Sequence, residues 1–468
     1  MPKDPPPIRP QLTVPALRRA LSRWDLVAIG INQVIGGAVF LVPAQIYLHL
    51  GAWSPFAILA VGLCSLFVAL CFAESGSRFE ATGGAYLYTR EAFGRFAGLE
   101  VAWMQWFTRV TSLASVANGI VLVLGIYLPV AGTEWSRMLI VTTVTVVLTL
   151  VNIWGIKQSA GLVNFLTIAK LLPLVALIVL GVLHIKSFAF PAFTTFHRLS
   201  GSDVAITLLL LVFTFGGFDV IGVPAGEAKS PRRDIPFAFV ATVGGVTLIL
   251  LLIQLILMGT DPALATALTP VADVMQSYTG GAGALLVGIA ATLSMMGNNM
   301  GQILSGSRVL YALSARGELP PSLGRVHATF RTPVNAIVLT SAVSLALALS
   351  GSFVRLAAVS AVARLAAYAG TAAATLKLRR MDRPGSANVV PAATFTIPGK
   401  ATVPILALVT SLLILAGATR EQLFSGALAL VIGALLFFVS NRFWIIRPAT
   451  GTAPLSELPQ LTGEHHDN

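Results

Sequence analysis

Long apolar runs, separated by short polar segments, fill the chain between residues 24 and 444. A helix needs about 20 mainly apolar residues to cross the ~30 Å hydrocarbon core of a bilayer, and these runs reach that length. Segments of about ten residues with alternating polarity, which build membrane β-barrels, do not occur in the sequence. We therefore predict an all-α integral membrane protein with about 12 transmembrane helices, over residues 24–48, 54–76, 97–128, 136–154, 159–184, 203–224, 236–258, 282–313, 333–351, 355–378, 402–418 and 422–444.

The composition supports this prediction, because only 11% of the residues are charged and 56% are hydrophobic. Soluble proteins carry about 25% charged residues. The net charge of +12 is also compatible with nucleic-acid binding, but the basic residues gather in alternate loops. If the N-terminus is inside, 23 of the 31 basic residues fall in inner segments and five in outer segments. Such asymmetry marks cytoplasmic loops, so we expect no nucleic-acid partner.

The loop charges also predict the organisation of the chain. We expect a multi-pass protein of the cell's inner (plasma) membrane with both termini in the cytoplasm. The bilayer is then its main environment, and its oligomeric state stays open. The predicted parts are a cytoplasmic N-terminal tail over 1–23, a transmembrane domain over 24–444 and a cytoplasmic C-terminal tail over 445–468.

Two glycine pairs interrupt apolar runs at related places. Gly36 and Gly37 lie in the first run, and Gly216 and Gly217 lie in the sixth. Each glycine weakens a helix by roughly 1 kcal/mol relative to alanine. Helices five runs apart cross the membrane in opposite directions, so the pairs favour an inverted repeat in which helices 1 and 6 are broken. Close helix packing through glycine is the alternative. The predicted parts are a first repeat over 24–184, a second over 203–378 and two extra helices over 402–444.

A broken helix also predicts what is bound. The interruption frees amide and carbonyl groups that lipid cannot satisfy but a buried polar ligand can. The N-terminus of a half-helix attracts a carboxylate, and the carbonyl end attracts an ammonium group. An amino acid zwitterion carries both groups.

Four segments resemble amino acid permeases of the amino acid–polyamine–organocation (APC) superfamily. Together they extend over the ten predicted repeat helices and their inner loops. They are "LSRWDLVAIGINQVIGGAVFLVPA" at 21–44, "ATGGAYLYTREAFGRFAGLEVAW" at 81–103, which we expect to be a loop leading into the third run, "FDVIGVPAGEAKSPRRDIP" at 218–236 and "SGSRVLYALSARGELPPSLGRVHATFRTP" at 305–333. The resemblance implies a LeuT-type 5+5 inverted repeat with an amino acid bound at its centre.

The resemblance also implies roles for residues at the first interruption. Family members hold the substrate carboxylate on backbone amides that correspond to Gly36, Gly37 and Ala38. The carbonyl groups around Ile35 are implied to receive the substrate amine. The family pattern usually has a glycine where Ala38 stands, and its methyl group narrows the space for a ligand.

At the second interruption the resemblance implies a corresponding set of substrate-binding residues. The substrate amine contacts carbonyl groups between Phe213 and Gly216, and Gly217 completes the break. An aromatic side chain often gates the site there, and Phe215 is the match. Asp219 follows this pair, and capping the break or binding the substrate amine are both open roles for its carboxylate.

Lys170 lies about 14 Å into the fifth run, too deep for its ammonium group to reach the interface fully. Pairing with carbonyl groups or packing against neighbouring helices would be a purely structural role. In similar sodium-independent permeases, a lysine at this place lies beside the broken first helix and occupies the position of a sodium ion. The resemblance therefore implies that Lys170 replaces sodium and carries coupling to protons.

Arg109 lies about 18 Å into the third run, where exposure to lipid costs at least ~2.5 kcal/mol. It either binds a substrate carboxylate or pairs with a carboxylate such as Asp219 or Glu100. Both roles disfavour a cationic substrate. Arg364 resembles an arginine found at that place in many family members, and we expect a structural contact. Asn298 is expected to support helix packing or the substrate.

The sequence argues against an enzyme. The chain has six histidines, mostly in loops, and no Ser/His/Asp set at a common membrane depth. We find no metal-ligand spacing, no cofactor site and no ATP site. Cys64 and Cys71 are roughly 10 Å apart on a helix, too far for a disulfide.

We therefore predict a secondary active amino acid transporter that works by alternating access. It is expected to be sodium-independent, proton-coupled or exchanging, and selective for neutral or acidic amino acids. The alternatives are an amino acid/amine antiporter for polyamines or cationic amino acids, and a transporter-like amino acid sensor. A passive channel would instead need similar polar groups along a continuous path.

Overall fold

A computed structural model describes residues 21–79, 83–127, 133–154, 159–184, 199–223, 228–381 and 390–443. The two predicted tails, 1–23 and 445–468, lie almost entirely outside the described residues. The described part is helical, with a single β-bridge between Leu21 and Ala228.

The long helices follow the predicted apolar runs closely. Within the described residues, nine stretches are long and apolar enough to cross a membrane, and the helices Val334–Ser350 and Thr402–Ala416 are apolar but shorter. Uninterrupted helices form at α3 (Ser54–Gly76), α5 (Arg95–Tyr127), α6 (Glu134–Trp154), α7 (Ser159–His184), α9 (Pro231–Thr260), α11 (Gly281–Ala315), α12 (Val334–Ser350), α13 (Phe353–Met381), α14 (Thr402–Ala416) and α15 (Arg420–Phe443).

The chain leaves the helical path at both glycine pairs. The first run forms α1 (Arg23–Val34) and α2 (Ala38–Leu50), and the sixth forms α8 (Gly201–Phe215) and the short 3-10 helix η4 (Phe218–Gly222). Each interruption lies at the glycine pair that predicted it.

Two short helices were not predicted. α4 (Ala85–Phe93) forms where we expected only a loop, and α10 (Pro270–Thr279) lies between α9 and α11. Glycines with positive φ lie at their ends: Gly84 at 53° and Gly94 at 89° on the two sides of α4, and Gly280 at 73° after α10. The prediction of a plain loop over this part of 81–103 was therefore wrong. Within the described residues, three further 3-10 turns are η1 (Gly51–Trp53), η6 (Leu264–Thr266) and η7 (Pro321–Gly324).

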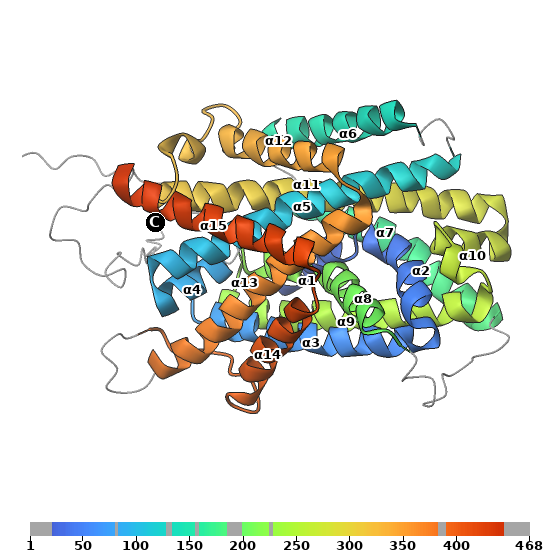
Figure 1. Ribbon diagram of the computed structural model, residues 1–468, viewed down its shortest axis with the longest axis horizontal. Helices are drawn as coiled ribbons and strands as arrows, with labels where there is room; N and C mark the ends of the chain where they lie inside the picture. The colour runs from blue at the N-terminus through green and yellow to red at the C-terminus, as the bar shows by residue number, and fades with distance from the viewer. Residues whose placement is uncertain are drawn as a thin grey trace, which may run out of the picture.

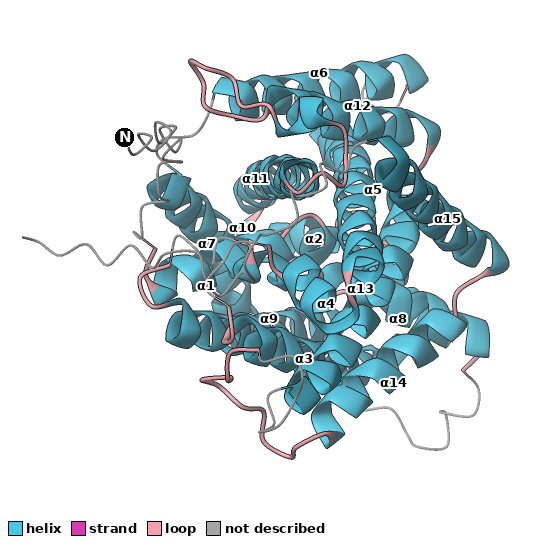
Figure 2. Ribbon diagram, turned by 90° about the vertical axis from the view of Figure 1, so that its left-hand side faces the viewer, coloured by secondary structure: helices cyan, strands magenta, loops and turns pink. Residues whose placement is uncertain are grey.

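Most of the long helices lie roughly along one axis, α13 and α14 cross it obliquely, and the broken helices lie inside the bundle (Figure 1, Figure 2). In α5, 83% of the most apolar stretch is buried, whereas in α6 and α15 the share is 22%. α6, α12, α14 and α15 lie at the rim in Figure 2. Exposed apolar side chains on the rim suit contact with lipid, where hydrocarbon takes the place of a protein neighbour.

Candidate functional site

The first interruption frees backbone groups at the ends of two half-helices. The last turn of α1 closes with the Ile35 N–H donating to Ile31 O at 2.8 Å and the Gly36 N–H donating to Val34 O at 2.8 Å. α2 then starts at Ala38, and the first amides of a helix have no partner within it. These amides, at the positive end of the α2 dipole, form one wall of a buried cavity.

Close packing explains the glycines. A Cβ on Gly36 would lie 2.9 Å from Nδ2 of Asn298. At Gly217, where φ is 123°, a Cβ would lie 2.7 Å from the backbone oxygen of Gln33. The two interruptions therefore pack against each other, and the second has a backbone conformation that only glycine adopts without strain.

Gly217→Ala is expected to lower the free energy of unfolding by about 1–3 kcal/mol, because it adds backbone strain and a clash with Gln33. Gly244→Ala is the matched control, since a Cβ there meets nothing within 4 Å. Thermal melting of both purified variants in one detergent tests this. A Gly217→Ala melting temperature equal to that of the control would contradict the packing argument.

Lys170 lies against the carbonyl end of α1. Its ammonium group donates to Asn32 O at 3.0 Å and to Ile35 O at 2.9 Å, and its side chain is buried. The hydroxyl of Ser294 donates to the same Ile35 oxygen at 3.1 Å. The carbonyl end of a helix attracts a cation, and here the ammonium group of the chain itself occupies that place.

The second interruption presents Phe213, not Phe215, to the cavity. The Gly216 N–H donates to Phe213 O at 3.0 Å, and both residues line the cavity. The Phe213 ring lies 6.0 Å from the Phe353 ring, edge to face. The Phe215 ring points toward α3, where a Cβ on Gly62 would lie 3.3 Å from its Cζ. Phe213, rather than Phe215, is therefore the aromatic side chain of α8 that borders the cavity.

A buried ionic cluster lies beside the cavity. Asp219 forms an ion pair with Arg109 through one carboxylate oxygen and accepts from Nη1 of Arg364 at 3.3 Å through the other. Nη2 of Arg364 donates to the Ser112 hydroxyl at 3.2 Å, and Nη1 of Arg109 donates to Oε1 of Gln302 at 3.5 Å. Of the two partners considered for Arg109, the structure pairs it with Asp219.

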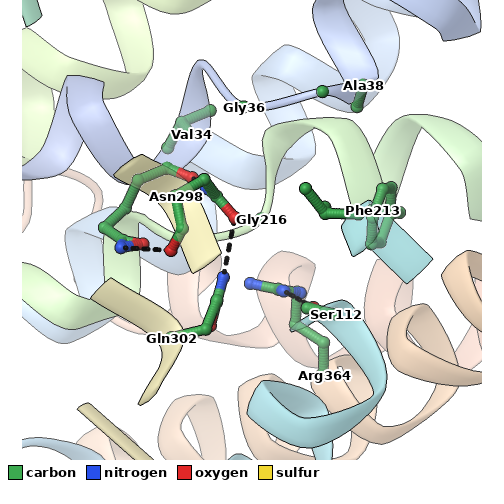
Figure 3. Close-up of a pocket in the computed structure, with 12 residues that line it drawn as sticks. Val34, Gly36, Ala38, Ser112, Phe213, Gly216, Asn298, Gln302 and Arg364 are labelled. Carbon is green, nitrogen blue, oxygen red and sulfur yellow. Dashed lines mark hydrogen bonds between the residues drawn. The ribbon is translucent and has the colours of Figure 1, made fainter. Parts of the chain in front are cut away.

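Arg109 forms the structural pair that was one of its two predicted roles, and Arg364 makes the predicted structural contacts and also lines the cavity. Arg364 lines the cavity, and its guanidinium group fills the space that a side chain on Gly216 would need (Figure 3). Arg109 is buried, pairs with Asp219 and does not line the cavity. Arg364 is therefore the arginine best placed to meet a ligand.

Three uncharged polar residues at the cavity, Gln33, Ser112 and Gln302, were missed by sequence reasoning. Two of them lie one helical turn from a residue that was singled out: Ser112 follows Arg109 by three positions, and Gln302 follows Asn298 by four. Nδ2 of Asn298 donates to Gln33 O at 2.6 Å, so Asn298 joins α11 to the end of α1.

The cavity is closed and small. Its volume is about 20 Å³, enough for about one water molecule. An amino acid requires the walls to separate, and the two short half-helix ends and the Arg364 side chain are the parts that border it (Figure 3). Arg364 lines the cavity, and with Arg109 and Asp219 it forms an ionic cluster of two guanidinium groups and one carboxylate.

No metal centre is evident in the part of the chain that the structure describes, where no three His, Cys, Asp or Glu side chains gather in a suitable arrangement. Both cysteines are free thiols.

Comparison with known proteins gives consistent matches. A family model described as amino acid permease matches residues 21–445. The branched-chain amino acid permease BcaP of Bacillus subtilis is 26% identical over 450 residues, which covers 91% of this chain and 94% of the relative. The serine/threonine exchanger SteT of the same organism is 26% identical over 89% of this chain and 95% of the relative. The human cystine/glutamate transporter is 27% identical over 72% of this chain and 69% of the relative. All are membrane transporters rather than enzymes.

Proposed function

This chain belongs to the amino acid permease family, and from that premise we propose that it is a secondary active transporter that carries amino acids by alternating access. One observation carries the proposal: the backbone groups freed at two helix interruptions border a single buried cavity. The amides at the start of α2 are suited to a carboxylate, and the carbonyl groups near Phe213 are suited to an ammonium group.

The proposed architecture is the LeuT-type inverted repeat, with halves over 24–184 and 203–378 and two further helices over 402–444. The interruption of the first helix in each half supports it. Rocking of one half against the other would open the closed cavity to each side in turn. The distribution of basic residues supports cytoplasmic termini and insertion in the plasma membrane.

We infer that transport is independent of sodium, because the Lys170 ammonium group occupies the cation place between Asn32 O and Ile35 O. A bound sodium ion would need the same carbonyl oxygens. Loss and return of the Lys170 proton would provide proton coupling, and exchange of one amino acid for another needs no ion at all.

The substrate class follows from charge. Two arginines and one aspartate leave the ionic cluster beside the cavity net positive, which repels a cationic side chain and attracts a carboxylate. Neutral or acidic amino acids are therefore favoured over arginine, lysine or polyamines. The names of the relatives, which cover branched-chain, hydroxyl and anionic amino acids, agree with this choice.

Uptake of labelled amino acids into proteoliposomes tests the proposal. We expect saturable uptake of a neutral or acidic amino acid in sodium-free buffer, and at least about tenfold slower uptake of arginine and putrescine, which is ~1.4 kcal/mol of discrimination. Efficient arginine or putrescine uptake would overturn the substrate class. Ligand-induced stabilisation without any flux would favour the transporter-like sensor.

The same panel on Arg364→Gln tests the role of the cavity arginine. We expect a rise of about tenfold in KM for acidic substrates and a smaller change for neutral ones, because Asp219 and Arg109 then balance each other. Ser112→Ala is the control, since it removes a partner of Arg364 and leaves every charge in place. Equal effects on acidic and neutral substrates would show that Arg364 has only a structural role.

A further inference from the structure

Basic side chains gather where the N-termini of α1 and α9 meet. The Lys229 N–H donates to Leu21 O at 2.9 Å, which brings the segment before α9 beside the start of α1. Arg23, Lys229, Arg232 and Arg233 are all exposed there. We call these four residues the basic corner. Two carboxylates in the same turns serve as helix caps: Asp25 accepts from the backbone of Ser22 and Asp234 from that of Ser230.

Aromatic side chains lie directly beside the basic corner. The Trp24 and Phe237 rings meet edge to face, with centroids 5.2 Å apart, and the Arg23 guanidinium lies 5.2 Å from the Phe237 centroid. Trp24 nevertheless stays 60% exposed. An exposed tryptophan next to arginine at the end of a membrane helix is typical of the lipid–water interface.

The face of α9 below the corner is apolar and exposed. Arg233, Phe237, Val240, Gly244 and Leu248 follow one another at intervals of three or four residues, so they form one stripe. Phe237 is 36% exposed, Val240 39% and Leu248 57%. A stripe of this kind faces acyl chains, and it ends at a cationic group where lipid headgroups lie.

We propose that the basic corner is a binding site for an anionic phospholipid. The headgroup phosphodiester accepts hydrogen bonds from Arg23 and Arg233, Lys229 adds positive charge, and one acyl chain lies along the α9 stripe. Charge selects an anionic lipid over a zwitterionic one, since each basic residue near the surface favours it by about fivefold. A free anion in solution would gain nothing from the apolar stripe.

The site also has a mechanical consequence. α1 carries the basic corner at its first turn and the Asn32 and Ile35 carbonyl groups at its last turn. α1 already packs against α9 (Figure 2). A lipid that bridges Arg23 and Arg233 links the two helices further. Bound anionic lipid therefore stabilises the arrangement in which α1 and α9 stay together.

Quenching of tryptophan fluorescence tests the lipid site without requiring transport. The full-length protein is placed in phosphatidylcholine vesicles. Each sample also contains one spin-labelled lipid, either phosphatidylglycerol or phosphatidylcholine, with the label near the headgroup. The difference between the wild type and Trp24→Phe isolates the signal of Trp24. We expect phosphatidylglycerol to quench Trp24 at an at least about fivefold lower mole fraction than phosphatidylcholine, and salt to reduce this preference.

Variants make the test specific. The double variant Arg23→Gln/Arg233→Gln is measured with and without Trp24→Phe. We expect it to need similar mole fractions of the two lipids for equal quenching, so that the ratio of these mole fractions is close to one. Arg442→Gln, which removes an exposed arginine at the end of α15, should keep the wild-type ratio. The ratio is used because a movement of Trp24 alone would change quenching by both lipids equally and would leave the ratio unaffected. An unchanged preference in the double variant, or no preference in the wild type, would overturn the proposal.

Discussion

Lys170→Ala is expected to reduce the initial rate of amino acid uptake by about 100-fold. The substitution removes the only donor to Asn32 O that the described residues show, and one of two donors to Ile35 O, because Ser294 still donates to the latter. A buried carbonyl group without a partner costs about 1–3 kcal/mol, and the charge at the end of α1 is lost as well. Uptake into proteoliposomes at equal protein content measures the effect.

Ser294→Ala is the matched control for Lys170→Ala. It removes a donor to Ile35 O and leaves the ammonium group in place, so we expect a loss of less than about tenfold. The sodium argument has its own test in the same assay. Uptake that requires sodium in the wild type and survives Lys170→Ala would contradict the role of Lys170 as the resident cation.

Asp219→Asn is expected to lower the stability of the protein by about 3–5 kcal/mol. The substitution leaves the guanidinium groups of Arg109 and Arg364 without an anion in a buried place. Removing one partner of a buried ion pair costs this much, because the remaining charge is not compensated. The expected observations are a low yield of monodisperse protein and a strongly lowered melting temperature.

Arg109→Gln/Asp219→Asn separates a charge effect from a packing effect. The double variant leaves one buried arginine instead of two, so it should melt at a higher temperature than Asp219→Asn alone. The two substitutions are then coupled by more than about 1 kcal/mol, as expected for side chains in direct contact. Additive effects, or an Asp219→Asn protein as stable as the wild type, would contradict a structural role for the cluster.

The sequence predicted the membrane helices and their two interruptions well, and physical reasons account for both. The length of an apolar run is set by the bilayer, so the ends of α3 and α7 match the predicted runs 54–76 and 159–184. Glycine weakens the interior of a helix, so a pair of glycines inside such a run indicates a break. α4 and α10 were missed because they are amphipathic helices of nine and ten residues, and a search for apolar runs of membrane-spanning length passes over them.

The candidate site was predicted less completely, because depth along a helix does not tell which way a side chain points. Arg109 and Arg364 both lie deep in their helices, yet only Arg364 faces the cavity. Phe213 and Phe215 are two residues apart, which is about 200° around a helix, so they face opposite sides. The position of Lys170 beside the end of α1 came from family resemblance, and its contacts with Asn32 and Ile35 agree with that position.

The most direct test of the account is competition by blocked substrate analogues. Uptake of the best labelled amino acid is measured against the unlabelled amino acid, its methyl ester, which lacks the carboxylate, and its N-acetyl form, which lacks the ammonium group. A site formed by the ends of half-helices needs both groups, so we predict that each analogue competes at least about 100-fold more weakly than the free amino acid. Competition by either analogue at the strength of the free amino acid would contradict binding of the zwitterion at the two helix interruptions.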